Sequence, residues 1–447
     1  MQPSSTPSTA EPTLFDAPDP PPRPVFIGID WADQAHAICL IDPERPAPQH
    51  SSLNQKPKAI AAWAEALHKK YAGRELCVII ESSKGALITA LSEVGGFTIY
   101  PINPKQAARY REALHPTGSK SDPADAQLLT KFLMHHRDSL RALQPDTPET
   151  RKLAELTQLR RTQVDERKRV TLQLRSILQK YFPLMLDLFA DQLDEPLVID
   201  LLKRWPSLLL LKRVNPSLLN TFLKEHGVRN DDRREELVKQ IRAAVDLTRD
   251  KALIEPLALH AQCLAKLIEV LVRSIAQFDS TIAQAVTEHE DAPIFKSLPG
   301  AGPALVPRLI VAFGSDRDRY QSAAELQNQS GIAPVTQQSG KSKSVHSRHA
   351  CPQFLKQTFH EFADQTRRWS PWAKAFYQSK KAAGMKHQAA VRALAFKWIR
   401  ILFHMWKHRT PYSPEHYTQA LTKANSPLAK LLPHTAPQNP EIAKNVT

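Results

Sequence analysis

Hydrophobic and polar positions change their spacing along the chain, and the first pattern runs from residue 25 to about residue 135. Short apolar runs, rich in β-branched residues, predict strands over 25–30, 35–41, 76–81 and 97–102. Apolar positions at helical spacing over 57–72 predict a helix between two of these strands. Strands that alternate with helices are typical of an α/β domain.

Further along the chain the spacing becomes helical. Apolar residues at steps of three and four predict two long helices, over 149–182 and 250–289, with shorter helices broken by prolines between them. The long helices could pair as an antiparallel or intersubunit coiled coil, or belong to an ordinary helix bundle, because their heptads are imperfect. A mainly helical unit is expected from residue 292 to about residue 410.

Composition predicts a tail at each end of the chain and so limits the folded part between them. Eight of the 36 prolines fall within residues 1–24, which predicts a disordered tail, and the polar, Pro- and Asn-containing end predicts a peripheral one. The expected division is a tail over 1–24, an α/β domain over 25–148, a helical or coiled-coil linker over 149–291, a helical domain over 292–410 and a tail over 411–447.

Net charge narrows the class of partner. The chain carries 60 Lys and Arg against 45 Asp and Glu, a net charge of +15, and residues 341–409 alone hold fifteen basic and two acidic residues. Such a concentration points to a polyanion, with nucleic acid as the first candidate. No apolar run approaches the ~18 residues that a membrane span needs. With no signal-peptide pattern either, a cytoplasmic protein without a membrane partner is expected.

Cysteine spacing excludes two further classes. Four cysteines lie far apart with no CxxC pair, so neither a disulfide framework nor a zinc ribbon is indicated.

Aromatic residues are interleaved with the basic stretch at helical spacing. That spacing favours packing in a core over stacking on bases. The residues concerned are Trp369, Trp372, Phe376, Tyr377, Phe396, Trp398 and Trp406.

A Pro-Gly-x-Gly turn opens the helical domain, at residues 299–302. A turn of this kind, built around Gly300 and Gly302, can present backbone N–H groups to a DNA phosphate, as in helix-hairpin-helix elements. An ordinary tight turn between helices is the plain alternative.

Four acidic residues occupy unusual places in a basic chain. Asp30 and Glu81 close apolar strands, and Asp122 and Asp125 lie at a helix start that Pro123 marks. Carboxylates grouped in this way repel one another unless hard cations lie between them, and two Mg²⁺ ions so held support phosphodiester chemistry. Each acid taken alone is more simply a strand-end or capping residue. Together and in this order, they match the layout of a ribonuclease H-like nuclease core.

Two sets of motifs resemble the insertion sequence 110 family of transposases, over about residues 25–405. The N-terminal set is Gly28-Ile29-Asp30, Ile80-Glu81, Ile102-Asn103-Pro104 and Lys120-Ser121-Asp122-Pro123-Ala124-Asp125-Ala126. The C-terminal set is Leu298-Pro299-Gly300-Ala301-Gly302-Pro303, Ser330-Gly331-Ile332-Ala333-Pro334 and Gln338-Ser339-Gly340-Lys341.

The resemblance implies a RuvC-like, ribonuclease H-like N-terminal domain, a coiled-coil linker and a mainly helical transposase domain. Asp30, Glu81, Asp122 and Asp125 would bind Mg²⁺ in a two-ion site, and Ser339 would attack the phosphodiester to form a covalent phosphoserine. The implied function is that of a transposase and site-specific recombinase of a mobile insertion element. Because a protein–DNA ester conserves the bond energy, strands could be exchanged without ATP.

The same resemblance implies the partners. These are double-stranded donor and target DNA, a structured non-coding guide RNA encoded beside the gene and called a bridge RNA, and a second subunit in a homodimer that assembles into a tetramer. The candidate nucleic-acid-binding residues are Lys120, Gly300, Gly302, Lys341, Lys343, Arg348, Arg367, Arg368, Lys380, Lys381 and Lys386.

Three alternatives remain open at this point. Ser342, Ser344 and Ser347 crowd the same polar stretch as Ser339, and only the Gln-Ser-Gly context selects Ser339. A RuvC-like structure-specific endonuclease would use water in place of serine. A non-catalytic nucleic-acid-binding scaffold would use the basic stretch alone.

Overall fold

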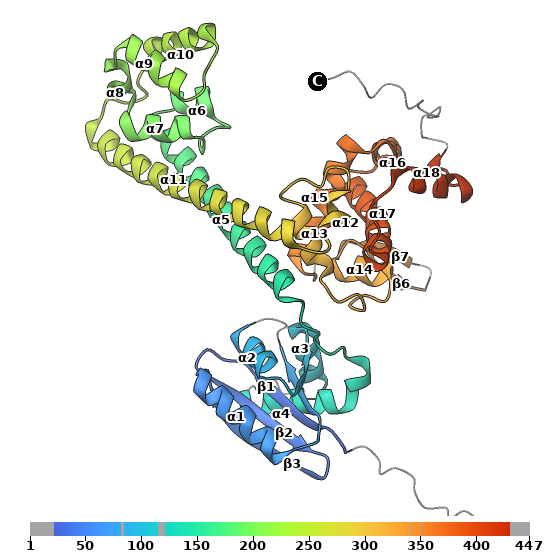
Figure 1. Cartoon of the computed structure of the whole chain (residues 1–447). Helices are drawn as coiled ribbons and strands as arrows, with labels where there is room; N and C mark the ends of the chain where they lie inside the picture. Colours follow the sequence, from blue (N-terminus) through green and yellow to red (C-terminus); the bar gives the residue numbers. More distant parts are fainter. Residues whose placement is uncertain (1–21, 82–84, 115–120, 341, 349, 430–447) are drawn as a thin grey trace, which may run out of the picture. The chain divides into compact units, whose positions relative to one another are not determined.

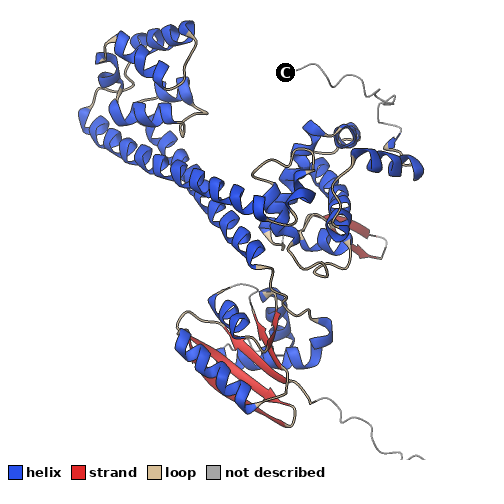
Figure 2. Cartoon of the chain, viewed as in Figure 1, coloured by secondary structure: helices blue, strands red, loops and turns tan. Residues whose placement is uncertain are grey.

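The computed structural model describes residues 22–81, 85–114, 121–340, 342–348 and 350–429, and the chain divides into two compact units between Pro145 and Asp146. The N-terminal unit holds a five-stranded sheet, and the C-terminal unit is helical apart from one hairpin (Figures 1 and 2). Each unit has hydrophobic clusters of its own.

The N-terminal sheet is mixed, with strand order β3-β2-β1-β4-β5. Its strands are β1 (Val25–Asp30), β2 (Ala35–Asp42), β3 (Arg45–Asn54), β4 (Leu76–Ile80) and β5 (Phe97–Pro101). Antiparallel pairing joins β1, β2 and β3, and parallel pairing joins β1, β4 and β5. The four strands predicted from apolar runs are confirmed. Strand β3 was not predicted, because it is a polar edge strand with Leu53 as its one buried residue.

Helices cover both faces of this sheet, because its strands alternate between two apolar sets. Val25, Ile27 and Ile29 pack with α1 (Pro57–Lys70) and α2 (Ala86–Val94). On the opposite face, Phe26, Cys77 and Ile79 pack with α3 (Pro104–Leu114) and α4 (Asp122–His136), which the short helix η1 (Arg137–Ser139) follows. The even positions of β1 and the odd positions of β4 therefore face α4.

Gly28 allows α4 to approach β1 closely. A Cβ atom at this position would lie 2.2 Å from the Ala126 carbonyl oxygen and 2.4 Å from the Thr130 hydroxyl oxygen. Thr130 secures the same contact, because its hydroxyl donates hydrogen bonds to the carbonyl oxygens of Cys39 (3.0 Å) and Ala126 (2.8 Å). The first turns of α4 are thus held against the carboxyl-terminal half of β1.

Two long helices run side by side in the C-terminal unit: α5 (Pro148–Tyr181) and α11 (Lys251–Glu288) (Figure 1). They are antiparallel. The Thr150 hydroxyl at the start of α5 lies 2.8 Å from His289 Nε2 just past the end of α11, and Arg160 Nε lies 2.5 Å from Asp279 Oδ1. The prediction of two long helices is confirmed, and they pair within one chain.

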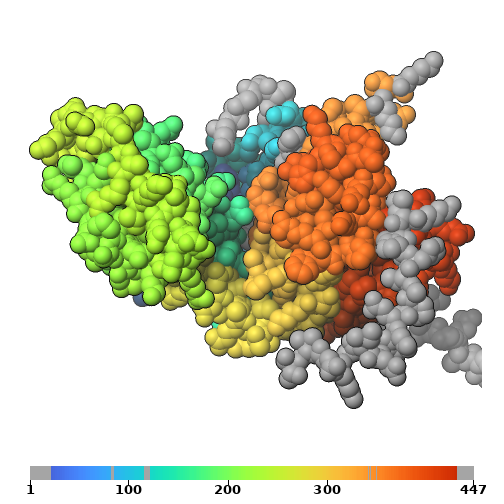
Figure 3. Space-filling view, turned by 90° about the horizontal axis from the view of Figure 1, so that it is seen from above, coloured from blue at the N-terminus to red at the C-terminus, as the bar shows by residue number. Residues whose placement is uncertain are grey.

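Five short helices connect the distal ends of α5 and α11. They are α6 (Leu184–Phe189), α7 (Pro196–Arg204), α8 (Leu208–Arg213), α9 (Pro216–Glu225) and α10 (Asp231–Ala243), and they appear in green in Figure 3. Pro196 and Pro216 stand in the first turns of α7 and α9, where a missing N–H costs nothing. Leu201, Leu202 and Phe222 join residues of α5 and α11 in a core separate from the C-terminal one.

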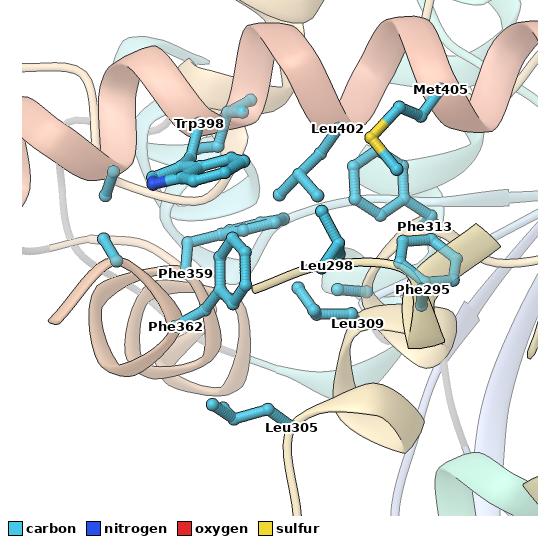
Figure 4. Packing of buried hydrophobic residues seen from close by; sticks show 14 of the residues in the cluster. Phe295, Leu298, Leu305, Leu309, Phe313, Phe359, Phe362, Trp398, Leu402 and Met405 are labelled. Atoms are coloured by element: carbon cyan, nitrogen blue, oxygen red, sulfur yellow. The ribbon is translucent and has the colours of Figure 1, made fainter. Parts of the chain in front are cut away.

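The C-terminal core gathers helices from residue 292 onward around α17 (His387–His408) (Figure 4). The other helices are α12 (Ala292–Lys296), α13 (Val306–Phe313), α14 (Ala323–Gln329), α15 (Gln353–Trp369), α16 (Pro371–Ala382) and α18 (Pro414–Lys423). Leu421 and Leu428 join this core, so the segment predicted as a peripheral tail packs on the domain up to residue 429.

The interleaved aromatics mostly pack in this core, as their spacing predicts. Trp372, Trp398 and Trp406 are buried, and Phe376, Tyr377 and Phe396 are partly buried against them. Trp369 is the exception, with 68% of its surface exposed.

A hairpin of β6 (Val335–Ser339) and β7 (Ser342–His346) interrupts the helical domain. The residue pattern did not predict this hairpin. Elsewhere in the described residues, no helix is long and apolar enough to cross a membrane. All four cysteines are free thiols. Burial raises the pKa of the Cys77 thiol to about 12, so this thiol packs as an apolar residue.

Candidate active site

Asp30 and Glu81 lie at the carboxyl ends of β1 and β4, two neighbouring strands of the N-terminal sheet. Strands β1 and β4 are parallel and pair Ile29 with Ile80, so the next residue on each strand, Asp30 and Glu81, lies at the same level. Strand alternation directs both side chains to the face that α4 covers, since Phe26 and Ile79 pack there. The two acids therefore occupy equivalent backbone positions at the carboxyl ends of neighbouring strands.

Helix α4 brings a third carboxylate to the same face. The helix begins at Asp122, with Ser121 as its N-cap residue, and Asp125 lies in its first turn. Asp125 is 3% exposed and directly precedes Ala126, whose carbonyl oxygen lies over Gly28. Asp122 is exposed. Of the four predicted acids, the structure therefore buries one, half-buries two, and leaves Asp122 open to solvent.

Arg111 of α3 joins two of these carboxylates. Its Nε lies 2.6 Å from Asp125 Oδ1, and one of its terminal nitrogens lies 3.9 Å from Glu81 Oε1. The structure thus brings Glu81 and Asp125 to one cation. Sequence reasoning missed Arg111, because it lies on a helix with several basic residues and only the packing of α3 on the sheet separates it from Arg109.

The second oxygen of Asp125 gives a test of whether a metal ion fits. Asp125 Oδ2 is buried and has no hydrogen-bond partner among the described residues. A buried carboxylate oxygen without a partner is costly, and a divalent cation would satisfy it. In the described part of the chain, no group of three potential metal ligands is found. The positive charge near Glu81 and Asp125 comes from Arg111, which contacts both carboxylates. The unpartnered Asp125 oxygen would suit a hard cation, while Arg111 neutralises the other oxygen of the same carboxylate.

Arg111→Gln is expected to lower the free energy of unfolding in EDTA by about 1–3 kcal/mol, because the buried Asp125 carboxylate loses its cationic partner. Mg²⁺ or Mn²⁺ should then stabilise the variant more than the wild type, since the ion no longer competes with a guanidinium. Thermal unfolding with and without the metal chloride measures both effects.

Arg109→Gln is the matched control, because Arg109 is exposed on the same helix. It should change neither quantity. Equal stabilisation of wild type and Arg111→Gln by the metal would contradict competition between Arg111 and the ion.

Ser339 lies in the C-terminal unit, at the tip of the β6–β7 hairpin. It is exposed and pairs with Ser342 across the turn. Gly340 follows with a φ of +55°, a left-handed conformation that glycine adopts without strain. Among the neighbouring serines, Ser344 differs, because its hydroxyl lies 3.0 Å from His346 Nε2. The hairpin therefore presents Ser339 at its tip and a serine–histidine pair on its return strand.

The predicted basic residues fall on several elements. Arg368, Lys381 and Lys386 are exposed. Arg367 is engaged within the protein, since it contacts Asp364 (2.5 Å) and its guanidinium lies 4.3 Å from the centre of the Tyr377 ring.

Other basic candidates are placed as follows. Lys380 lies 5.5 Å from the centre of the Phe376 ring, and Arg348 reaches Asn328 Oδ1 at 3.5 Å. Lys120, Lys341 and the side chain of Lys343 lie outside the described part of the structure.

The Pro-Gly-x-Gly turn leads into α13. The N–H of Ala301 donates to the Leu298 carbonyl (3.3 Å), and those of Leu305 and Val306 donate to the Gly302 carbonyl (2.9 and 3.1 Å). These three N–H groups are thus occupied within the turn. The turn also borders a cavity of the C-terminal domain.

This combination defines a class of protein. A mixed sheet with strand order β3-β2-β1-β4-β5, acids at the carboxyl ends of β1 and β4, and an acid in the first turn of α4 form the ribonuclease H-like fold of a DEDD transposase domain. A family model of that domain, described as a transposase, matches residues 27–183. A second model, described as transposase of the IS116/IS110/IS902 family, matches residues 292–378.

Three relatives match over nearly their whole length. The protein described as the mini-circle transposase for IS117 of Streptomyces coelicolor is 28% identical over 415 residues, which cover 90% of this chain and 98% of the relative. An IS110 protein of 43.6 kDa from the same organism is 25% identical over 87% of this chain and 95% of its own length. A 42 kDa IS900 protein of Mycobacterium paratuberculosis is 23% identical over 89% and 99%. The chain belongs to the IS110 family of transposases.

Proposed function

We propose that this protein is a metal-dependent DNA recombinase that moves an insertion element through a covalent phosphoserine intermediate. One observation carries the proposal most directly: Glu81 and Asp125 meet at Arg111 while a second, buried oxygen of Asp125 has no partner among the described residues. Carboxylates at the ends of parallel strands are suited to hold the cations that phosphodiester chemistry requires.

Mg²⁺ is the cation that this oxygen-only set suits best. Asp30, Glu81 and Asp125, joined by the exposed Asp122, would hold it in a two-ion site. When bound, the metal would supply Lewis-acid polarisation of a phosphate oxygen. The protein's own part is to fix Asp125 through the close contact of α4 with Gly28 and to keep the site's charge balanced through Arg111.

Ser339 is the proposed nucleophile. Its hydroxyl oxygen attacks the phosphorus of the scissile phosphodiester, the bond from phosphorus to one deoxyribose oxygen breaks, and that oxygen leaves with a proton while the serine proton passes to solvent. Attack by the deoxyribose hydroxyl of an exchanged strand reverses the step and releases Ser339. Support comes from the exposure of Ser339 at the hairpin tip and from the match of residues 292–378 to the transposase family.

Donor and target DNA are the proposed substrates, and a structured guide RNA is the proposed source of sequence specificity, since base pairing can select a site that the protein itself does not read. The exposed Arg368, Lys381 and Lys386 support a role of the C-terminal domain in holding phosphates.

A homodimer that assembles into a tetramer is also proposed, with a coiled coil built on α5 and α11 and with Ser339 of one subunit serving the carboxylates of another. Large apolar side chains exposed along the two helices support contacts between subunits. They are Leu159, Leu172, Leu259, Leu267 and Val270, with exposed fractions between 42% and 63%.

Asp125→Asn tests the proposed chemistry, because it removes the charge and keeps the shape. Formation of excised element circles, measured in cells carrying the gene with its flanking DNA, is expected to fall at least about a hundredfold. Asp138→Asn, an exposed acid in η1, is the matched control and should retain wild-type excision.

Wild-type excision by both Asp125→Asn and Glu81→Gln would contradict a catalytic role of these carboxylates. That result would favour the non-catalytic scaffold.

A further inference from the structure

The C-terminal domain contains a cavity of about 840 Å³ that neither the carboxylates nor Ser339 explains. One wall is the turn from Leu298 to Leu305, another is the side of α15 that carries His360 and Gln365, and the start of α17 closes it at His387. Leu298 and Leu305 also belong to the hydrophobic core of the domain, in which Leu298 lies between Leu402 and Leu309 (Figure 4). This volume is in the range of cavities that take small organic ligands.

Trp369 forms an aromatic platform at this cavity. It lines the cavity at the last residue of α15, yet 68% of its surface is exposed, whereas Trp372, Trp398 and Trp406 are buried. The turn holds the indole from one side, because a Cβ atom on Gly300 would lie 2.8 Å from Trp369 Cδ1. Gly300 has a φ of +75°, so both its conformation and its contact with Trp369 require glycine. One edge of the ring is fixed while most of its surface remains available.

Both carboxylates in the cavity wall are paired with arginines of the protein. Glu361 pairs with Arg308 and lies 3.8 Å from Arg161. Asp364 pairs with Arg367 and lies 3.8 Å from His387. The two carboxylates are therefore already occupied by cations of the protein itself.

Three further side chains in the wall are polar without carrying a charge. Burial lowers the pKa of His360, so its imidazole is neutral at pH 7. The amides of Gln365 and Gln388 each offer both hydrogen-bond donors and an acceptor. The cavity thus combines an aromatic face with neutral donors and acceptors.

The cavity reaches the backbone of the turn, and exposed basic residues neighbour its lining residues in sequence. A Cβ atom on Gly302 would meet nothing within 4 Å, so the cavity reaches the backbone of the turn. Arg368 adjoins Trp369 and Lys386 adjoins His387 in sequence, and both are exposed. Two exposed cationic residues therefore each lie one position away in sequence from a residue that lines the cavity.

We propose that this cavity receives an unstacked base of a nucleic acid strand, with the base on Trp369 and its phosphates toward Arg368 and Lys386. A nucleobase is planar, uncharged and edged with donors and acceptors, which matches the wall, and its backbone is anionic, which matches the basic neighbours. The inference rests on the proposed function, since it assigns a strand of the DNA or of the guide RNA to a particular site.

Binding is tested in EDTA, where no metal-dependent cleavage takes place, with 12-nucleotide single strands of DNA and of RNA and with the paired DNA duplex. Trp369→Ala should weaken single-strand binding about tenfold or more, as removal of a stacking aromatic does, and change duplex binding less than about twofold. In the wild type, 2-aminopurine placed in the strand should lose fluorescence on binding. Trp369→Phe should restore most of the affinity.

Gly302→Val is a second variant, which fills the cavity from the turn and should weaken single-strand binding while leaving Trp369 in place. Met385→Ala is the control for an exposed apolar side chain in the same domain. Tighter binding of the RNA or of the DNA strand identifies the source of the base. Unchanged single-strand affinity in both variants, or equal weakening of single strand and duplex, overturns the inference.

The proposed function and the base-binding site can fail separately. Asp125→Asn should lower excision, whereas its affinity for single strands in EDTA should equal that of the wild type. A protein that binds single strands through Trp369 yet does not recombine DNA would therefore overturn the proposed function alone.

Discussion

Ser339→Ala is expected to abolish the covalent attachment of the protein to DNA and to lower excision at least about a thousandfold, the scale on which removal of a catalytic nucleophile acts. Ser339 is exposed at a hairpin tip beside Gly340, so loss of its hydroxyl leaves no buried group unpaired and the fold should be unaffected. Adducts that survive denaturation with SDS, detected as slowly migrating DNA that protease releases, measure the attachment.

Ser344→Ala is the matched control, since it lies in the same hairpin and its hydroxyl is the one next to His346. Ser344→Ala should keep the adduct. If the adduct instead depends on Ser344 and persists in Ser339→Ala, the nucleophile is misassigned. Hydrolytic nicks that continue in Ser339→Ala, with no adduct in the wild type, would identify the water-dependent endonuclease.

Gly28→Ala is expected to destabilise the N-terminal unit by about 3 kcal/mol, because overpacking of a tight contact forces the backbone apart. The added methyl would lie 2.2 Å from the Ala126 carbonyl oxygen, a backbone atom that a rotamer change cannot move. Displacement of α4 would carry Asp125 away from Glu81 as well, so activity should fall with stability. Chemical denaturation followed by far-UV circular dichroism measures the loss.

Gly73→Ala separates this effect from backbone strain. Gly73 has a φ of +78° and nothing within 4 Å of an added Cβ, so only the left-handed conformation is penalised, by about 1 kcal/mol. If Gly28→Ala costs no more than Gly73→Ala, the close contact between α4 and β1 does not determine the geometry of the site.

Residue patterns predicted the parts of the fold whose residues alternate or repeat. The apolar strands β1, β2, β4 and β5 and the long helices α5 and α11 were found in this way. Strand β3 and the β6–β7 hairpin were not predicted, because their side chains are mostly polar and their stability comes from pairing with a neighbouring strand.

The candidate site was predicted only in part, for a related reason. Asp30 and Glu81 could be identified because an acid that ends an apolar strand is visible in the sequence. Arg111 could not, since its contact with Asp125 depends on how α3 and α4 pack on the sheet.

Trp369 shows the limit of periodicity. Its spacing resembles that of the buried Trp372, but it is the last residue of α15, where Ser370 and Pro371 begin the next helix. The chain changes direction there, so the residue leaves the apolar face that the spacing predicts.

The antiparallel pairing of α5 with α11 has a consequence for how this family can vary. Thr150 contacts His289, and Leu153 shares a core with Ile282, so the chain leaves the C-terminal domain and returns to it at the same place. The rest of α5 and α11, together with α6 to α10, therefore forms an arm inserted between two neighbouring positions at the C-terminal core. Matched removal of helical turns from both long helices would shorten this arm without altering the C-terminal core, so arm length and core chemistry are free to evolve independently.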